Sequence, residues 1–237
     1  MLSKKNLLLL SSSRVGTTDY LSHALGMIKD HLLDVTDVLF IPYAGVTISY
    51  DKYTEMVGNA LSSINVTVHS IHQFSDPVAA VKSAKAIVIG GGNTFQLLAQ
   101  LYNNNLVSAI KEKVEQGTPY IGWSAGSNLA CPTIKTTNDM PIICPPSFDA
   151  LNFVPFQINP HYIHGNPPGH NGETREQRLK EFLELNSKIT AVGLREGTML
   201  KIDAQKINLI GAHPARIFKH QQAFYELTAN EDFSFLM

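Results

Sequence analysis

The sequence predicts an α/β fold in which a mainly parallel sheet is flanked by helices on both faces. Short, continuous apolar runs alternate with segments of helical periodicity through the first half of the 237 residues. Continuous apolar strands separated by helices are typical of parallel sheets that are buried on both sides. Two glycine motifs directly follow such runs, at the strand ends where α/β sheets bind ligands. With 44% hydrophobic residues, the chain is long enough to form one domain over residues 1–237.

The expected strands of the first half are short apolar runs. They cover residues 7–10, 38–41, 66–71, 86–89 and 120–123. The segments between them carry apolar residues near helical spacing. These expected helices cover residues 20–33, 53–61, 78–83, 95–102 and 106–114. Pro42 stops the second strand and Gly117 ends the last of these helices, because proline and glycine interrupt regular structure.

The second half of the chain has a less regular pattern. Residues 132–172 are rich in Pro, Asn and Gly, which predicts a long functional loop with short strands. Residues 173–185 are predicted to form a charged amphipathic helix. Residues 190–194, 199–202 and 206–210 are predicted to be strands joined by tight turns.

Composition excludes several classes of partner. The formal net charge is −1 and the lysines and arginines are scattered, so no basic field for nucleic acid or anionic membrane is expected. The two cysteines, Cys131 and Cys144, lack metal-ligand spacing and are expected to be reduced. The apolar residues 6–10 are too few for a signal peptide or a membrane span. We therefore expect a soluble cytoplasmic protein, either a monomer or a homodimer.

The motif Gly122-Trp123-Ser124-Ala125-Gly126 follows the last of the expected apolar strands. A Gly-x-Ser-x-Gly turn between a strand and a helix leaves little room beside the serine, which glycine accommodates. The serine then lies at a helix N-terminus, where backbone N–H groups stabilise an oxyanion. This context favours Ser124 as a nucleophile over a residue of an ordinary tight turn.

A glycine-rich segment, Gly90-Gly91-Gly92-Asn93-Thr94, ends the neighbouring expected strand. Three glycines allow the backbone to approach another group closely and to present an N–H without steric hindrance. The Gly-Lys-Ser/Thr ending of a phosphate-binding loop is missing, which disfavours nucleotide binding. Together with Ser124, this loop is predicted to supply a second oxyanion donor.

The nucleophile requires a general base and an acid that orients the base. His161, after a strand-like run, is one candidate base and would need an acid such as Glu196. His213 is the rival, and Ser124, Asp203 and His213 would match the residue order of an α/β-hydrolase esterase. Spacing alone leaves both possibilities open. His161 also forms a His-x-x-His pair with the histidine three residues on, but it lies in an expected loop and no glutamate stands between the two. A metal site is therefore not expected.

Several ordered segments resemble the peptidase E family of α-aspartyl dipeptidases. The resemblance runs from the first strand to the region of Glu196 and weakens over the last few dozen residues. It rests on residues 40–47, 90–98, 120–126, 136–141, 157–161 and 172–178. It implies a three-layer sandwich similar to that of class I glutamine amidotransferases, with serine in place of their cysteine. The His-x-Glu pair of those enzymes is absent, because Ile163 stands two residues after His161, so glutaminase activity is not implied.

The resemblance also implies roles for individual residues. Ser124 would be the nucleophile, His161 the general base and Glu196 the third member of the triad. The backbone N–H groups of Gly92 and Ala125 would form the oxyanion hole. No metal or organic cofactor is implied.

The implied substrate is a dipeptide with an N-terminal L-aspartate. Arg175 is the expected partner of the aspartate side chain, because a guanidinium binds a carboxylate through two hydrogen bonds; Arg178 is the second candidate. Asn93 is expected to contact substrate, and Asp139 and Glu173 are candidate acceptors for its α-ammonium group. A cyanophycinase-like hydrolase of β-aspartyl peptides is the main alternative within the wider family.

Overall fold

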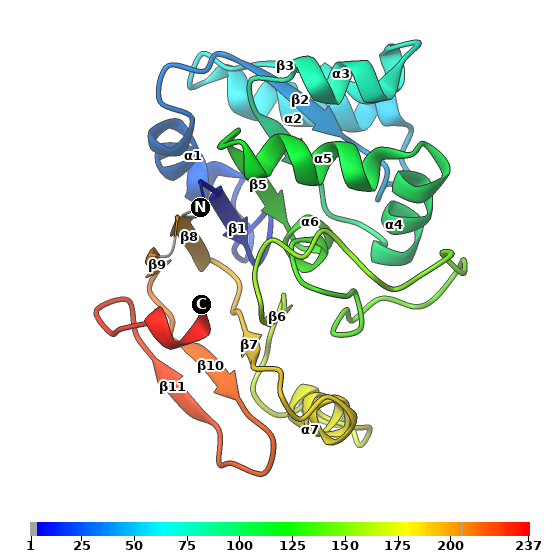
Figure 1. Cartoon of the computed structure of the whole chain (residues 1–237). Coiled ribbons are helices and arrows are strands. Elements are labelled where there is room, and N and C mark those ends of the chain that lie inside the picture. Colours follow the sequence, from blue (N-terminus) through cyan, green and yellow to red (C-terminus); the bar gives the residue numbers. More distant parts are fainter. Residues whose placement is uncertain (1–3, 205) are drawn as a thin grey trace.

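The protein folds around a seven-stranded sheet and a smaller four-stranded sheet (Figure 1). The computed structural model describes residues 4–204 and 206–237. In the larger sheet the strand order is β3-β2-β4-β5-β1-β8-β9. The first five of these run parallel, whereas β8 and β9 are antiparallel to their neighbours. The bounds are β1 Asn6–Leu10, β2 Asp37–Ile41, β3 Thr67–Ser70, β4 Ile87–Ile89, β5 Tyr120–Trp123, β8 Met199–Asp203 and β9 Lys206–Ile210.

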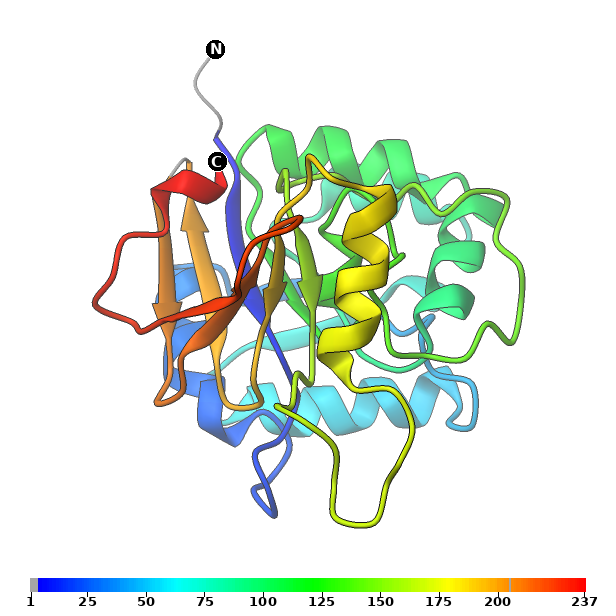
Figure 2. The same cartoon turned by 90° about the horizontal axis from the view of Figure 1, so that it is seen from below.

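Helices cover both faces of the larger sheet. Along β1, Leu7 and Leu9 join one buried cluster while Leu8 and Leu10 join another, because successive side chains of a strand point to opposite faces. Helices α1 and α2 pack into the second cluster, and α3 to α6 pack into the first, so that the two groups lie on opposite sides of the strands (Figure 2). The bounds are α1 Leu25–Leu32, α2 Tyr50–Ser62, α3 Pro77–Ser83, α4 Thr94–Asn103, α5 Leu106–Glu115 and α6 Ala125–Leu129. The predicted fold class is confirmed.

Three helix starts differ from the predicted ones by two residues or more. Helix α1 begins at Leu25 instead of residue 20, because Leu21 has a left-handed backbone and residues 22–24 form a 3-10 turn. Side-chain caps explain the other two starts. Helix α2 begins at Tyr50, because the Ser49 hydroxyl accepts a hydrogen bond from a first-turn N–H and satisfies a donor that the helix cannot pair. Helix α7, Arg175–Leu185, begins two residues later than predicted. There the Thr174 hydroxyl accepts from the Gln177 N–H, and the Gln177 side chain accepts from the Thr174 N–H, which forms a capping box.

The four-stranded sheet is not predicted by the sequence. Its strand order is β11-β10-β7-β6, with β6 and β7 parallel and the other pairs antiparallel. Helix α7 covers one face with Leu179 and Leu183, which cluster with Phe218, and Figure 2 shows this helix in front of the strands. The other face joins the core of the larger sheet. The bounds are β6 Gln157–Asn159, β7 Ala191–Gly193, β10 Ala215–Phe218 and β11 Tyr225–Leu227.

The two sheets bring four strand ends toward one region. Strand β5 pairs with β1 in parallel, with Trp123 opposite Leu10, so both strands end at the same edge. Strands β6 and β7 also run parallel, with Asn159 opposite Gly193.

Over the part of the chain that the structure describes, no helix combines the length and apolar character needed to cross a membrane.

Candidate active site

Ser124 lies in a sharp turn between β5 and α6. Its backbone has φ 54° and ψ −112°, a conformation that residues other than glycine rarely adopt. The Ser124 N–H donates to the Leu10 carbonyl at 3.1 Å, and the Ser124 carbonyl accepts from the N–H groups of Ser127 and Asn128. These bonds tie the turn to β1 and to the start of α6. The strand, elbow and helix therefore follow one another as the motif predicts.

The glycines on either side of Ser124 are required by close backbone contacts. A Cβ atom on Gly122 would lie 2.5 Å from the carbonyl oxygen of Gly126. A Cβ atom on Gly126 would lie 2.3 Å from the carbonyl oxygen of Ile89 in β4. Neither contact is tolerable without moving backbone, so the elbow demands glycine at both positions.

Alanine at position 126 is expected to destabilise the fold. The added methyl group presses on the backbone of β4, and overpacking of this kind lowers the free energy of unfolding by about 1–3 kcal/mol or more. The matched control is Gly58→Ala in α2, where a Cβ atom meets nothing within 4 Å. This control is expected to raise the free energy of unfolding by about 0.5–1 kcal/mol, because glycine is unfavourable inside a helix. Urea denaturation measures both values, and equal stability of Gly126→Ala and wild type would contradict the steric argument.

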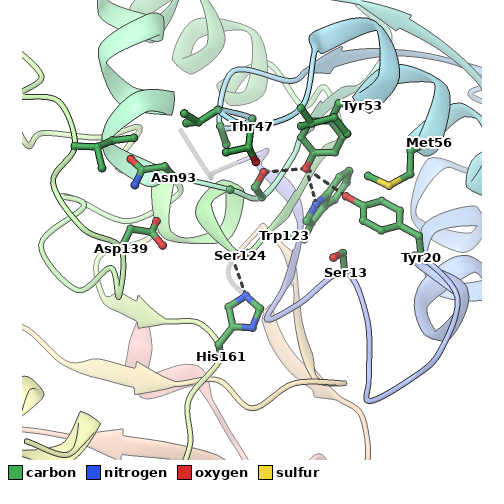
Figure 3. Close-up of a pocket in the computed structure, with 17 residues that line it drawn as sticks. Ser13, Tyr20, Thr47, Tyr53, Met56, Asn93, Trp123, Ser124, Asp139 and His161 are labelled. Carbon is green, nitrogen blue, oxygen red and sulfur yellow. Dashed lines mark hydrogen bonds between the residues drawn. The ribbon is translucent and has the colours of Figure 1, made fainter. Parts of the chain in front are cut away.

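A chain of hydrogen bonds links Ser124 to His161 and Glu196. The His161 Nε2 atom lies 2.9 Å from Ser124 Oγ (Figure 3). On the other side of the ring, His161 Nδ1 lies 2.7 Å from Glu196 Oε1. An imidazole held in this way presents one nitrogen to the hydroxyl while the carboxylate orients the other. The structure thus brings together three of the predicted site residues.

The three residues come from both sheets. Ser124 follows β5 of the larger sheet, whereas His161 follows β6 and Glu196 follows β7 of the smaller one. Because β6 and β7 are parallel neighbours, their carboxyl ends place the imidazole and the carboxylate side by side. Residues far apart in sequence therefore meet where the two sheets join.

Ser11 connects the end of β1 to the segment that carries His161. His161 has a left-handed backbone, with φ 52°, and its N–H donates to Ser11 Oγ at 2.9 Å. The fully buried Ser11 hydroxyl donates in turn to the Leu194 carbonyl at 2.7 Å. The Ser11 hydroxyl therefore pairs with the His161 N–H and the Leu194 carbonyl just beyond the ends of β6 and β7. These bonds hold the turn from which the His161 side chain reaches Ser124. Sequence reasoning missed Ser11, although the run of three serines directly after the first apolar strand was a usable signal.

Two backbone N–H groups near Ser124 have no acceptor among the described residues. Over the described residues, neither Gly92 nor Ala125 donates its backbone N–H to another protein group. Ala125 is the first residue of α6, where helix geometry leaves the N–H unpaired. Gly92 has φ 132°, and a Cβ atom there would lie 2.2 Å from the carbonyl oxygen of Ala44. Only glycine fits at this position.

Ser124 and His161 line a cavity of about 720 Å³. Asn93 and Asp139 lie on one side of Ser124, and an aromatic wall lies on the other (Figure 3). Ile142 also lines the cavity. The remaining lining residues come from the loops after β1, β2 and β4, from α2 and from β5; they are Ser13, Tyr20, Ala44, Gly45, Val46, Thr47, Ile48, Tyr53, Met56, Gly91, Gly92 and Trp123. A volume of this size matches sites for small-molecule ligands.

Asn93 and Asp139 line this cavity and also support the start of α4. The Asn93 Oδ1 atom caps the helix by accepting from a first-turn N–H, and its Nδ2 donates to the Met140 carbonyl at 2.9 Å. Asp139 Oδ2 accepts hydrogen bonds from the Thr94 N–H at 2.7 Å and the Thr94 hydroxyl at 2.6 Å. Thr137 donates a further bond to the same oxygen. Asp139 Oδ1 accepts no hydrogen bond from the described residues, so it remains available to a ligand.

Arg175 and Glu173 lie outside the cavity that Ser124 lines. Both border a neighbouring depression of about 220 Å³ at the N-terminus of α7. Glu173 is half exposed, with Oε2 3.7 Å from Arg178 Nε. Burial lowers the pKa of the Arg175 guanidinium, as does the positive charge of Arg178, whereas the Asp139 carboxylate acts in the opposite direction. Arg175 is therefore close enough to Asp139 to interact with it electrostatically, but it does not line the cavity that contains Ser124.

The structure does not assemble the alternative triad of Ser124, Asp203 and His213. Asp203 pairs with Asn6 at the start of β1, whereas Leu10 at the Ser124 end of β1 pairs with Met199. The acid is therefore at the opposite end of the sheet from the nucleophile. His213 lies in the exposed β9–β10 connection and does not line the Ser124 cavity. The esterase alternative fails because the antiparallel direction of β8 carries Asp203 away.

An ion-pair network that sequence reasoning missed includes Tyr162 and Arg195, the chain neighbours of His161 and Glu196. Arg216, 6% exposed, donates to Glu176 and, through Nε at 2.9 Å, to Glu226. Arg195 Nη2 also donates to Glu226, at 2.5 Å. The Tyr162 hydroxyl donates to Glu176 at 2.9 Å. Buried charges need such pairing, and the network connects the segments that follow β6 and β7. No local sequence pattern predicts it, because its five members lie in α7, β10, β11 and the turns after β6 and β7.

The chain is similar to known peptidases over nearly its whole length. The model of Peptidase family S51 matches residues 7–210. A Peptidase E of Shewanella sp. (strain W3-18-1) is 51% identical over 232 residues, which cover 98% of each chain. A Peptidase E of Shewanella baltica (strain OS155 / ATCC BAA-1091) is 52% identical over 232 residues, again 98% of each chain.

Solved structures share the fold at lower identity. A candidate Peptidase E from Listeria monocytogenes EGD-e matches with a TM-score of 0.64 and 23% identity, over 88% of this chain and 99% of its own. A peptidase from an acI-B1 Actinobacterium matches with a TM-score of 0.67 and 19% identity, over 97% of this chain and 96% of its own. The similarity to these two structures establishes the fold. The match to the family model and the identity to the Shewanella proteins establish the family. The chain belongs to peptidase family S51.

Proposed function

We propose that this peptidase is a serine-type exopeptidase that hydrolyses dipeptides with an N-terminal L-aspartate. The observation that carries the proposal is the hydrogen-bonded chain from Ser124 through His161 to Glu196. It supplies a nucleophile, a base within 2.9 Å of that nucleophile and an acid that orients the base. The names of the Peptidase E relatives support the same reaction class.

The first half of the reaction is acylation. His161 Nε2 takes the proton of Ser124 as Oγ attacks the carbonyl carbon of the Asp-X bond. The tetrahedral oxyanion accepts hydrogen bonds from the Gly92 and Ala125 N–H groups, which donate to no described protein group. Return of the proton from His161 to the leaving nitrogen expels the second amino acid and leaves an aspartyl ester on Ser124.

The second half of the reaction is hydrolysis of that ester. His161 deprotonates a water molecule, which attacks the ester carbon, and the same N–H groups stabilise the second oxyanion. Collapse of this intermediate returns a proton to Ser124 and releases aspartate. Glu196 keeps His161 in the required tautomer and stabilises the imidazolium in both halves. All of these steps use protein groups and water.

Selectivity for aspartate requires a cation for the side-chain carboxylate. Arg175 supports this role because its half-buried guanidinium makes no hydrogen bond or salt bridge with the described residues. The proposal requires this side chain to turn from its depression toward the Asp139 side of the cavity when substrate binds. Asp139 Oδ1, which faces no protein donor, is the proposed acceptor for the substrate α-ammonium group. Glu173 is the less favoured acceptor, because it lies outside the cavity.

Arg175→Ala is expected to lower kcat/KM for Asp-Leu by roughly 10- to 150-fold, the scale of a lost hydrogen bond between charged groups. The selectivity for Asp-Leu over Ala-Leu should collapse at the same time, because only the aspartate substrate uses the guanidinium. Lys180→Ala is the matched control, since Lys180 is an exposed cation on the same helix. An unchanged Asp-Leu to Ala-Leu ratio in Arg175→Ala would transfer the role to another residue, with Arg178 tested next.

The substrate class is tested by release of free amino acid from a panel of dipeptides. Asp-Leu should be cleaved much faster than Glu-Leu, Asn-Leu and β-Asp-Leu, because an α-aspartyl carbonyl and a short carboxylate side chain must fit together. Fast cleavage of β-Asp-Leu or β-Asp-Arg, with little of Asp-Leu, would replace the proposal with the β-aspartyl alternative. Rapid cleavage of longer Asp-initiated peptides would contradict the dipeptidase assignment.

A further inference from the structure

The hydroxyl of Tyr53 lies at the centre of three hydrogen bonds beneath the glycine-rich loop (Figure 3). It is 2.9 Å from the Gly91 carbonyl oxygen, 3.2 Å from the Tyr20 hydroxyl and 3.3 Å from Trp123 Nε1. Tyr53 is only 4% exposed, and its ring packs edge-on against Phe40 at 5.1 Å. A polar atom buried in this way has few alternative partners, so these three contacts determine which hydrogen bonds the Tyr53 hydroxyl makes.

The direction of each proton in this cluster follows from the groups present. The indole Nε1–H of Trp123 is only a donor, and the Gly91 carbonyl is only an acceptor. The Tyr53 oxygen therefore accepts from Trp123 and from the Tyr20 hydroxyl, and its single proton is donated to Gly91. Burial raises the pKa of Tyr53, so the hydroxyl keeps that proton.

This bond holds the peptide plane that contains the Gly92 N–H. In a planar trans peptide, the carbonyl of one residue and the N–H of the next point in opposite directions, and no cis peptide occurs in the described residues. With the Gly91 carbonyl directed at Tyr53, the Gly92 N–H must point away from Tyr53. A plane between two glycines has little steric resistance to rotation, so a side-chain bond is needed to keep it in one orientation.

The packing of the loop agrees with this arrangement. A Cβ atom on Gly90 would lie 2.4 Å from the Tyr53 hydroxyl, so glycine at position 90 makes room for the tyrosine. A Cβ atom on Gly91 would lie 3.0 Å from the Cβ of Ser124, which places the loop directly beside the nucleophile. The three consecutive glycines thus admit Tyr53 on one side and Ser124 on the other.

We infer that Tyr53 is a positioning residue for the oxyanion hole, which acts by holding the Gly91–Gly92 peptide with its N–H directed at the reacting oxygen. The inference rests on the proposed acyl-transfer function. It also assigns a role to Trp123, the residue before the nucleophile, whose indole N–H orients the Tyr53 hydroxyl toward Gly91. Tyr53 does not touch the reacting atoms itself.

Tyr53→Phe tests the inference, because it removes the hydroxyl and keeps the ring. The expected result is a fall in kcat for Asp-Leu of roughly 10- to 100-fold, somewhat less than the loss of an oxyanion donor itself, with KM little changed. Tyr102→Phe is the matched control, since the Tyr102 hydroxyl also donates to a backbone carbonyl, that of Asp149, at 2.9 Å.

A second measurement separates this inference from the choice of substrate. A fluorophosphonate probe phosphonylates Ser124 with loss of fluoride, and its phosphoryl oxygen uses the same N–H donors. The labelling rate of the folded protein should fall in Tyr53→Phe in proportion to kcat and stay near wild type in Tyr102→Phe. If wild type labels but does not cleave Asp-Leu, a reduced rate in Tyr53→Phe still supports the inference while the proposed substrate fails. Wild-type labelling rates in Tyr53→Phe, with the thermal midpoint as the measure of folding, would overturn it.

Discussion

Ser124→Ala is expected to abolish Asp-X hydrolysis, with kcat/KM reduced by roughly 10⁴- to 10⁶-fold. The removed oxygen is the atom that the proposed mechanism joins to the aspartyl group, and no other described hydroxyl lies within hydrogen-bond distance of His161 Nε2. The fold should survive, because the backbone bonds of residue 124 to Leu10, Ser127 and Asn128 use no side-chain atom. Release of free aspartate measures the reaction, and urea denaturation measures the fold.

A second serine separates loss of the nucleophile from general effects of removing a buried hydroxyl. Ser70 is fully buried and its hydroxyl contacts His72 at 2.6 Å, outside the Ser124 cavity. Ser70→Ala should keep wild-type kcat while losing some stability, since a buried hydrogen bond contributes about 1 kcal/mol. Turnover by Ser124→Ala at a rate comparable with Ser70→Ala would eliminate Ser124 as the nucleophile.

His161→Ala is expected to be nearly as damaging, with kcat lowered by roughly 10⁴-fold or more. Without the imidazole, Ser124 has no base and the leaving nitrogen has no proton donor. His213→Ala is the matched control, because His213 is the rival base in the sequence but is exposed in the β9–β10 connection. Steady-state kinetics on Asp-Leu should show near wild-type values for His213→Ala. The opposite ranking of the two variants would reject the assignment of the base.

The predictable parts of the fold are those that depend on local pattern. Residues 7–10 and 86–89 read as buried strands because every position is apolar, and both lie at the centre of the larger sheet. The four-stranded sheet escaped prediction because β10 and β11 are short, and because β10 joins β7 across the intervening strands β8 and β9. Strand β7 was predicted as a strand, but nothing in its sequence states that it pairs with β6 rather than with β8.

The predictable parts of the site follow the same division. Ser124 was readable because its elbow is contained within five residues. The choice between His161 and His213 depended on family resemblance, because contacts across 37 residues leave no spacing rule. Ser11 and Tyr53 act through backbone groups of distant residues, and Ser11 lies 150 positions from His161. A side chain that hydrogen-bonds to a backbone group far away in sequence has no local sequence motif by which it can be recognised.

The division of the proposed catalytic residues between two sheets has a consequence for the protein as it is synthesised. The proposed nucleophile and the glycine-rich loop belong to the first 126 residues, whereas the proposed base and acid come later, after β6 and β7. Strand β1 is also incomplete on one side until β8 pairs with it. Because chains are synthesised from the N-terminus, Ser124 and the glycine-rich loop leave the ribosome before His161 and Glu196 do. The proposed triad can therefore form only after the C-terminal half of the chain has been synthesised and has folded against the elbow.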